Sequence, residues 1–177
     1  MALTTKHICF FILSLFLSTC FEGSLSAITL EDYKKNKLTY TVEWKTYSLP
    51  KNEQISLYGA KRRRFVTEQF YWGEAGYGAL TGKRSGYLEG GVFAGYQDYF
   101  SPELLYDARI FFGAGGGGSA PQGGGMIVHG TFGIGMPLQK DLHVTAEVGY
   151  IKFLNGEIES PTLGINLNYS FWEIEKK

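Results

Sequence analysis

The fold of this chain is decided near its end, where residues 162–172 read TLGINLNYSFW. Large apolar or aromatic side chains occupy every second position of this stretch (Leu163, Ile165, Leu167, Tyr169 and Phe171). The positions between them hold small or polar residues (Thr162, Gly164, Asn166, Asn168 and Ser170). Such alternation is typical of a β-strand that separates an apolar environment from a polar one.

The same alternation recurs along most of the chain after residue 37. It is regular in residues 38–45, 87–96, 105–112, 126–136 and 142–150, and less regular in residues 54–60 and 65–80. Together with the last segment these stretches make about eight strands, and almost none of the sequence after residue 27 has the period of an amphipathic helix. We therefore predict an all-β fold.

The predicted connections between these strands form two groups. Three are compact: KRRR (61–64), SPEL (101–104) and PLQKD (137–141). The others are YSLPKNE (47–53), LTGKRSG (80–86), the glycine-rich stretch 113–125 and LNGEIESP (154–161). When consecutive strands alternate in direction, the compact group falls on the periplasmic side and the other group on the outer side. Short periplasmic turns and longer outer loops are typical of a transmembrane β-barrel.

These observations predict an eight-stranded antiparallel up-and-down transmembrane β-barrel over residues 37–172, with a periplasmic lead-in (28–36) and a C-terminal tail (173–177). Trp44, Tyr96, Tyr150, Tyr169 and Trp172 lie at or near segment ends, where aromatic girdles meet the membrane surfaces. Side chains alone fill the interior of a barrel of this size. The alternative is a secreted soluble ligand-binding β-barrel, in which the apolar face would form the core.

The N-terminus has the features of a secretory signal peptide. Lys6 precedes an uncharged apolar run, residues 8–20, and small residues follow it up to Ala27. The run is shorter than the roughly 20 residues that a membrane-spanning helix needs. We predict a signal peptide over residues 1–27, cleaved after Ala27. In a minor alternative, Leu17–Cys20 is a lipobox and the mature protein is a lipoprotein acylated at Cys20.

Composition excludes several classes of function. Both cysteines, Cys9 and Cys20, lie in the predicted signal, so the mature chain is expected to have neither a disulfide framework nor a thiolate metal site. The whole chain has 17 basic and 17 acidic residues, and the signal removes one of each. A neutral chain gives no reason to expect a nucleic-acid partner. The sequence indicates no metal site and no cofactor.

The glycine-rich stretch GAGGGGSAPQGGG (113–125) contains the spacing of a dinucleotide-binding loop. That motif requires a helix beginning at its last glycine, and here Pro121, more glycines and a strand follow instead. No Gly-Lys-Ser/Thr follows either, which excludes a P-loop. We interpret the stretch as a flexible hairpin loop whose first glycines continue the preceding strand.

The polar face of the predicted strands carries charge. Its ionisable residues are Glu43, Glu74, Glu89, Asp107, Arg109, His129 and Glu147. We expect them to form a lumen network of salt bridges and hydrogen bonds, since an unpaired buried charge is costly. Lys45 and Arg109 are the obvious cations, which leaves some acids to be hydrated or protonated. Alternatively, His129, Thr131 and Glu147 supply the base, nucleophile and orienting group of an acyl hydrolase.

The signal peptide, the alternating segments and the aromatic ending Tyr169–Trp172 together resemble the small eight-stranded outer-membrane β-barrels of Gram-negative bacteria. The resemblance implies an outer-membrane location and outer-membrane lipids, lipopolysaccharide and the barrel-assembly machinery as partners. Within that class, His129-Gly-Thr131 with Glu147 is similar to the His-x-Ser and Glu of lipid A deacylases, with Thr131 in place of Ser. The sequence leaves the oligomeric state open. We predict a structural or interaction protein, with a lipid-acting esterase as the alternative.

The basic run Lys61–Arg64 has two interpretations. In the first, it lies at a compact turn and is a solvated charged turn or an anchor of the membrane topology. In the second, it binds the phosphates of anionic lipid or lipopolysaccharide.

Overall fold

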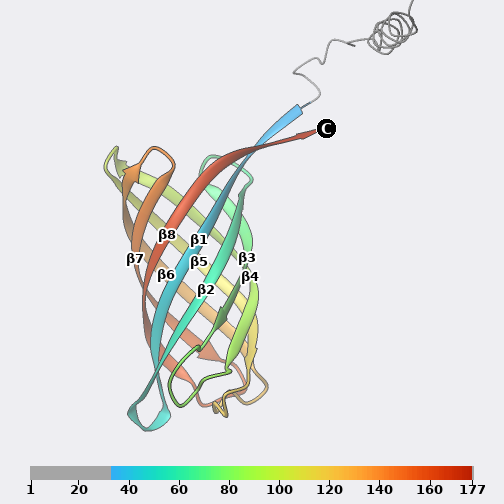
Figure 1. The fold of residues 1–177 in the computed structure, drawn as a ribbon, viewed down its shortest axis with the longest axis vertical. Helices are drawn as coiled ribbons and strands as arrows, with labels where there is room; N and C mark the ends of the chain where they lie inside the picture. The colour runs from blue at the N-terminus through green and yellow to red at the C-terminus, as the bar shows by residue number, and fades with distance from the viewer. Residues whose placement is uncertain (1–32, 177) are drawn as a thin grey trace, which may run out of the picture. The chain divides into compact units, whose positions relative to one another are not determined.

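The computed structural model describes residues 33–176, and their strands close into one antiparallel β-barrel (Figure 1). The strands are β1 (Tyr33–Leu49), β2 (Glu53–Phe65), β3 (Phe70–Gly78), β4 (Leu88–Ser101), β5 (Leu104–Gly116), β6 (Met126–Gln139), β7 (Leu142–Phe153) and β8 (Glu159–Lys176). A short 3₁₀ turn, η2 (Pro50–Asn52), joins β1 to β2. Each strand pairs with its sequence neighbours, and β8 closes against β1. The predicted up-and-down barrel is confirmed.

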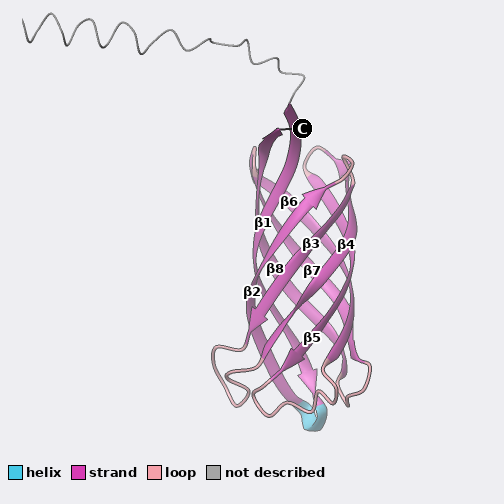
Figure 2. Ribbon diagram, turned by 90° about the vertical axis from the view of Figure 1, so that its right-hand side faces the viewer, coloured by secondary structure: helices cyan, strands magenta, loops and turns pink. Residues whose placement is uncertain are grey.

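The connections divide between the two ends of the barrel, as predicted. Residues 66–69, 102–103 and 140–141 connect strands at the end where β1 begins and β8 ends, here called the inner end (Figure 2). The other connections lie at the opposite, outer end. Four residues of the predicted lead-in (33–36) and four of the predicted tail (173–176) belong to β1 and β8. The predicted signal peptide, its cleavage site and Cys20 lie outside the described residues.

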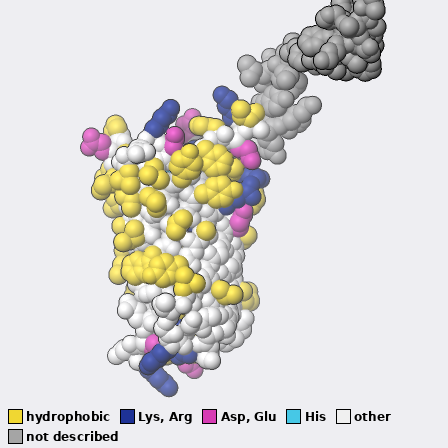
Figure 3. Space-filling model, in the orientation of Figure 1, with side chains coloured by type: hydrophobic (Ala, Val, Ile, Leu, Met, Phe, Trp, Pro, Cys, Tyr) yellow, Lys and Arg dark blue, Asp and Glu magenta, His cyan; other side chains and the backbone are white. Residues whose placement is uncertain are grey.

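Through most of its height the barrel is apolar outside and polar inside. Val42, Val92, Ile110, Phe132, Val148 and Ile165 point outward and are 43% to 67% exposed. Thr41, Gln97, Thr145, Asn166 and Asn168 point inward and are at most 4% exposed. Hydrophobic side chains accordingly cover much of the visible outer surface, whereas the lower end is largely polar (Figure 3). This is the reverse of a soluble barrel.

At the outer end the two faces exchange character. On the β1–β2 hairpin the inward positions become Tyr47, Leu49, Ile55 and Leu57, all buried, and the outward positions become Thr46, Ser48, Gln54 and Ser56. The exchange begins just beyond Trp44 and Tyr58, which are register partners. The hairpin thus leaves the apolar band and continues into water, where an apolar interior is favourable. The change of pattern explains why residues 54–60 alternate less regularly.

The run Lys61–Arg64 does not form a turn, contrary to the prediction. It continues β2, and the turn lies at residues 66–69, where Thr67 Oγ1 accepts hydrogen bonds from the amides of Gln69 and Phe70 at 3.3 and 2.9 Å. Lys61 and Arg63 point into the lumen and are 1% and 3% exposed. The run can lie within one strand because its like charges alternate in direction. Lys61 and Arg63 have partners in the lumen, whereas Arg62 and Arg64 project from the outer face of the wall.

Glu74 faces outward, which corrects its predicted place in the lumen. It is 51% exposed in its side chain and lies 3.4 Å from the outward-facing Arg62. The inward positions of β3 are taken by Tyr71, Ala75 and Tyr77. The hydroxyl of Tyr71 donates to Asp107 at 2.7 Å and that of Tyr77 to Glu43 at 2.8 Å. These phenols fix the register, because a shift of one residue would move both out of the lumen.

The glycine-rich stretch is the hairpin loop between β5 and β6, as predicted, and it packs closely against its neighbours. A Cβ at Gly123 would lie 1.6 Å from the carbonyl oxygen of Asn155, so only glycine fits this close approach. Arg84 binds both carboxylate oxygens of Glu53, at 3.1 and 2.8 Å, and also reaches the carbonyls of Gly118 and Ser119. Three outer connections are thereby joined. As predicted, the first glycines continue β5.

Candidate functional site

The lumen contains a balanced set of buried charges. Four cations (Lys45, Lys61, Arg63 and Arg109) face four carboxylates (Glu43, Glu89, Asp107 and Glu147), and none is more than 7% exposed. These eight side chains, four positive and four negative, lie on the five strands β1, β2, β4, β5 and β7. The lumen charge is therefore formally zero.

The pair nearest the outer end joins β1 to β4. The ammonium of Lys45 contacts Glu89, and both side chains are almost completely buried. The hydroxyls of Tyr47 and Tyr87 donate to the other carboxylate oxygen of Glu89 at 3.2 and 3.3 Å. Lys45 Nζ also lies 3.5 Å from the ring centroid of Tyr77, a cation–π contact. Every charge in this layer thus has a partner.

The central layer holds two carboxylates between two cations. Lys61 Nζ lies 2.7 Å from Glu43 and 3.5 Å from Glu147. Arg109 binds Glu147 through two hydrogen bonds, at 3.1 and 2.7 Å. Bidentate pairs of this kind are among the stronger charged contacts in proteins. The geometry locks Glu147 between two fixed cations.

The layer nearest the inner end is centred on Arg63 and Asp107. One guanidinium nitrogen of Arg63 donates to Asp107 and to Gln97, each at 3.1 Å. Its other terminal nitrogen donates to Thr41 at 3.2 Å and to Asn168. Arg109 lies 3.9 Å from Asp107 and so connects this layer to the central one. The side chains form one continuous polar network.

Two of the four cations were missed by the sequence analysis. Lys61 and Arg63 were assigned to a turn, which left only Lys45 and Arg109 as partners for the acids. With all four cations in the lumen, the charge balance does not require hydrated or protonated carboxylates. Lys61 and Arg63 are two positions apart, which matches the period of a strand and places both side chains on the same face. This spacing is the sequence signal that could have identified the two lumen cations.

An apolar layer closes the lumen at its outer end. Its buried side chains include Leu49, Ile55, Leu57, Ile127, Ile151, Phe153 and Ile158. Tyr87, from the β3–β4 connection, lies between this layer and Glu89. Burial raises the pKa of the Tyr87 phenol, and the nearby Glu89 carboxylate raises it further. The phenol therefore stays protonated and can donate its hydrogen bond.

The three residues of the predicted hydrolytic site all lie on the lumen side, and no hydrogen bond among the described residues joins them to one another. His129 is 4% exposed, and its Nε2 shares a hydrogen bond with Thr162 Oγ1 at 2.9 Å. Thr131 Oγ1 has no hydrogen-bond partner among the described residues. Glu147 is bound by Arg109 and Lys61. The barrel wall separates all three side chains from lipid outside.

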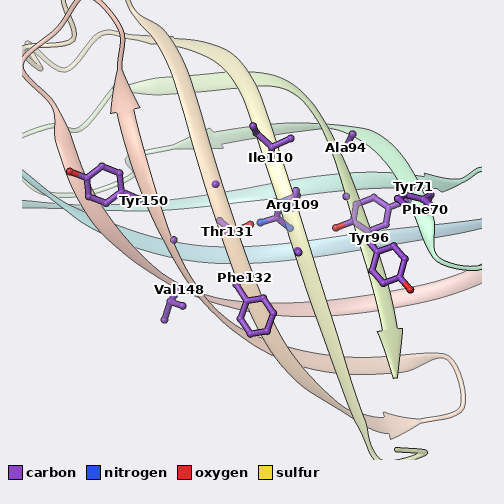
Figure 4. A pocket seen from close by; sticks show the side chains of 14 residues that line it. Phe70, Tyr71, Ala94, Tyr96, Arg109, Ile110, Thr131, Phe132, Val148 and Tyr150 are labelled. Carbon is purple, nitrogen blue, oxygen red and sulfur yellow. The ribbon is translucent and has the colours of Figure 1, made fainter. Parts of the chain in front are cut away.

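A shallow groove crosses the outer surface of β3 to β7 (Figure 4). Its volume is about 870 Å³, and its lining includes the small residues Ala94, Ala108 and Gly130. Phe70 and Tyr96 stand at one side, with Phe132, Val148 and Tyr150 at the other. This surface is apolar and open to the surrounding lipid, so it suits an acyl chain better than a polar ligand.

An apolar outer band, a charged lumen and a closed antiparallel wall define a transmembrane β-barrel. No helix among residues 33–176 is long and apolar enough to cross a membrane. Within the same range, no group of three or more His, Cys, Asp or Glu side chains is arranged to hold a metal ion.

Comparison with known proteins supports this class. No known protein-family profile matches the chain, and no curated protein matches its sequence. The N-terminal β-barrel domain of Pseudomonas aeruginosa OprF is similar in structure, with a TM-score of 0.59 and 13% identity over 76% of this chain and 97% of that one. Neisserial surface protein A (NspA) has a TM-score of 0.52 and 11% identity over 78% and 99%. The chain has the fold of the small eight-stranded outer-membrane β-barrels.

Loss of one lumen cation should destabilise the barrel strongly. Lys61→Met leaves Glu43 and Glu147 with fewer partners, and breaking a buried pair in this way costs about 3–5 kcal/mol. The control is Lys152→Met, which removes an exposed pair with Glu159 (3.0 Å) and should cost about 0–1 kcal/mol. Urea unfolding in lipid vesicles, followed by tryptophan fluorescence, measures both. Equal losses of unfolding free energy in the two variants would contradict a stabilising role of the lumen network.

The arrangement around His129 also predicts that the barrel releases no fatty acid from lipid A. We expect mass spectrometry to find the same lipid A in cells with the protein, without it, and with His129→Ala. Deacylated lipid A that requires the protein and disappears with His129→Ala would instead establish the hydrolase alternative.

Proposed function

We propose that the protein is an integral outer-membrane protein of structural or interaction type, with a sealed lumen and a fixed set of outer connections as its working surface. The observation that carries the proposal is the filled interior. Paired charges occupy the lumen, and an apolar layer closes its outer end. A barrel filled in this way suits display or binding better than passage of solutes.

The outer end is built to hold its shape. Arg84 joins the β1–β2 hairpin to the glycine-rich loop, and the amide of Glu157 donates to the carbonyl of Pro121 at 3.2 Å. All four outer connections are therefore linked. A preorganised surface loses little entropy when it binds a partner, which favours an interaction role.

Location and partners belong to the same proposal. The predicted signal peptide supports export, and the apolar band supports insertion among outer-membrane lipids and lipopolysaccharide. Insertion of such a barrel would involve the barrel-assembly machinery.

Two measurements on the same preparation test the proposal. The protein should fractionate with the outer membrane and migrate differently on gels with and without boiling. After reconstitution into planar bilayers, it should give no stepwise ion conductance, because its lumen is filled. A soluble periplasmic band without a heat-dependent shift would restore the soluble binding barrel. Discrete conductance steps from an outer-membrane preparation would contradict the sealed lumen but not the outer-membrane location.

A further inference from the structure

An ion pair lies on the outer surface of the barrel among apolar side chains. Arg62 on β2 and Glu74 on β3 are register partners, and both project outward. Their side chains are 36% and 51% exposed and lie 3.4 Å apart. This pair stands apart from the lumen network and has no role in the proposed function.

The pair lies near the middle of the apolar band. Arg62 is four residues from Tyr58 towards the inner end, and Glu74 is four residues from Phe70 towards the outer end. Tyr58 is the partner of Trp44 at the outer girdle, whereas Phe70 packs against Tyr96 near the inner one. Four residues of a tilted strand cover roughly 10 Å of depth, and the band of such a barrel is about 25 Å tall. Charged groups at this depth are unfavourable against lipid.

The barrel itself does not satisfy this pair. The only hydrogen bond of the Arg62 side chain within the described residues is the long one to Glu74, and its Nε is buried without an acceptor. By contrast, Arg64 lies over the ring of Trp72 at 5.7 Å. Hydrocarbon supplies neither donors nor acceptors. The exposed carboxylate and guanidinium therefore need polar partners from outside the barrel.

A row of small residues runs beside the pair. Ala60, Gly76, Gly90 and Ala114 are successive register partners across β2 to β5. A Cβ at Gly76 would meet no atom within 4 Å, so packing inside this chain does not require glycine there. Small residues at a membrane-facing position let a second backbone approach closely.

We propose that this face, made of Arg62, Glu74 and the small-residue row, binds a second copy of the chain. Two copies inserted in the same direction are related by a two-fold axis along the membrane normal, so each residue keeps its depth. Because Arg62 and Glu74 are neighbours at similar depth, the rotation places Arg62 of one copy opposite Glu74 of the other. The surface is thus self-complementary, as a two-fold interface requires. The proposal needs membrane insertion, which the fractionation experiment tests separately.

Disulfide cross-linking in membranes tests the interface. With Cys9 and Cys20 replaced by serine, Gly76→Cys should form a covalent dimer on oxidation. The matched control is Gly130→Cys on β6, where a Cβ likewise meets no atom within 4 Å. It should remain monomeric. A heat-dependent gel shift confirms that each variant is folded.

Charge reversal distinguishes an interface from a pair within one barrel. In the Gly76→Cys background, Arg62→Glu should lower the dimer yield about tenfold, since like charges then face each other across the axis. Adding Glu74→Arg should restore the yield. Equal cross-linking at Gly76 and Gly130, no dimer at Gly76, or a cross-linked band containing a different protein would each overturn the proposal.

Discussion

The structure depends on one property of its surroundings: hydrocarbon offers no hydrogen-bond partner. The wall must therefore satisfy its own backbone by closing β8 against β1, and charges inside it must find partners within the lumen. The four buried cations and four buried carboxylates meet this requirement together. Their balance explains why charged residues can occupy the interior of so narrow a barrel.

The same constraint sets the limits of the membrane band along each hairpin. Where the chain passes Trp44 and Tyr58, the apolar side chains move from the outer face to the inner one. Leu57, Ile55 and Leu49 then form a small core of the soluble kind. One pair of strands thus carries both patterns, and the point of exchange marks the water surface. The apolar layer at the outer end and the polar network of the lumen therefore follow from the same constraint, on opposite sides of that point.

The fold could be predicted from the sequence because alternation persists where each strand faces lipid on one side and the lumen on the other. Leu163, Ile165 and Leu167 show this directly. Prediction failed where the pattern changes for reasons outside the strand. The partners of Lys61 and Arg63 are residues such as Glu43 and Asp107 on other strands, which local sequence does not show. Glu74 was misplaced because glycines and aromatics obscure the register of β3.

The most direct test of the inside-out arrangement uses two of the protein's three tryptophans, Trp44 and Trp72. Trp72 is 44% exposed on the outer surface and Trp44 is partly exposed there, whereas Trp172 shares the alternate positions of β8 with Asn168 and Ser170, so it is replaced by phenylalanine (Trp172→Phe) for the measurement. Fluorescence should be quenched strongly by lipids brominated on their acyl chains and weakly by iodide in solution. Strong quenching by iodide with no effect of brominated lipid would show that the apolar face is not in the membrane.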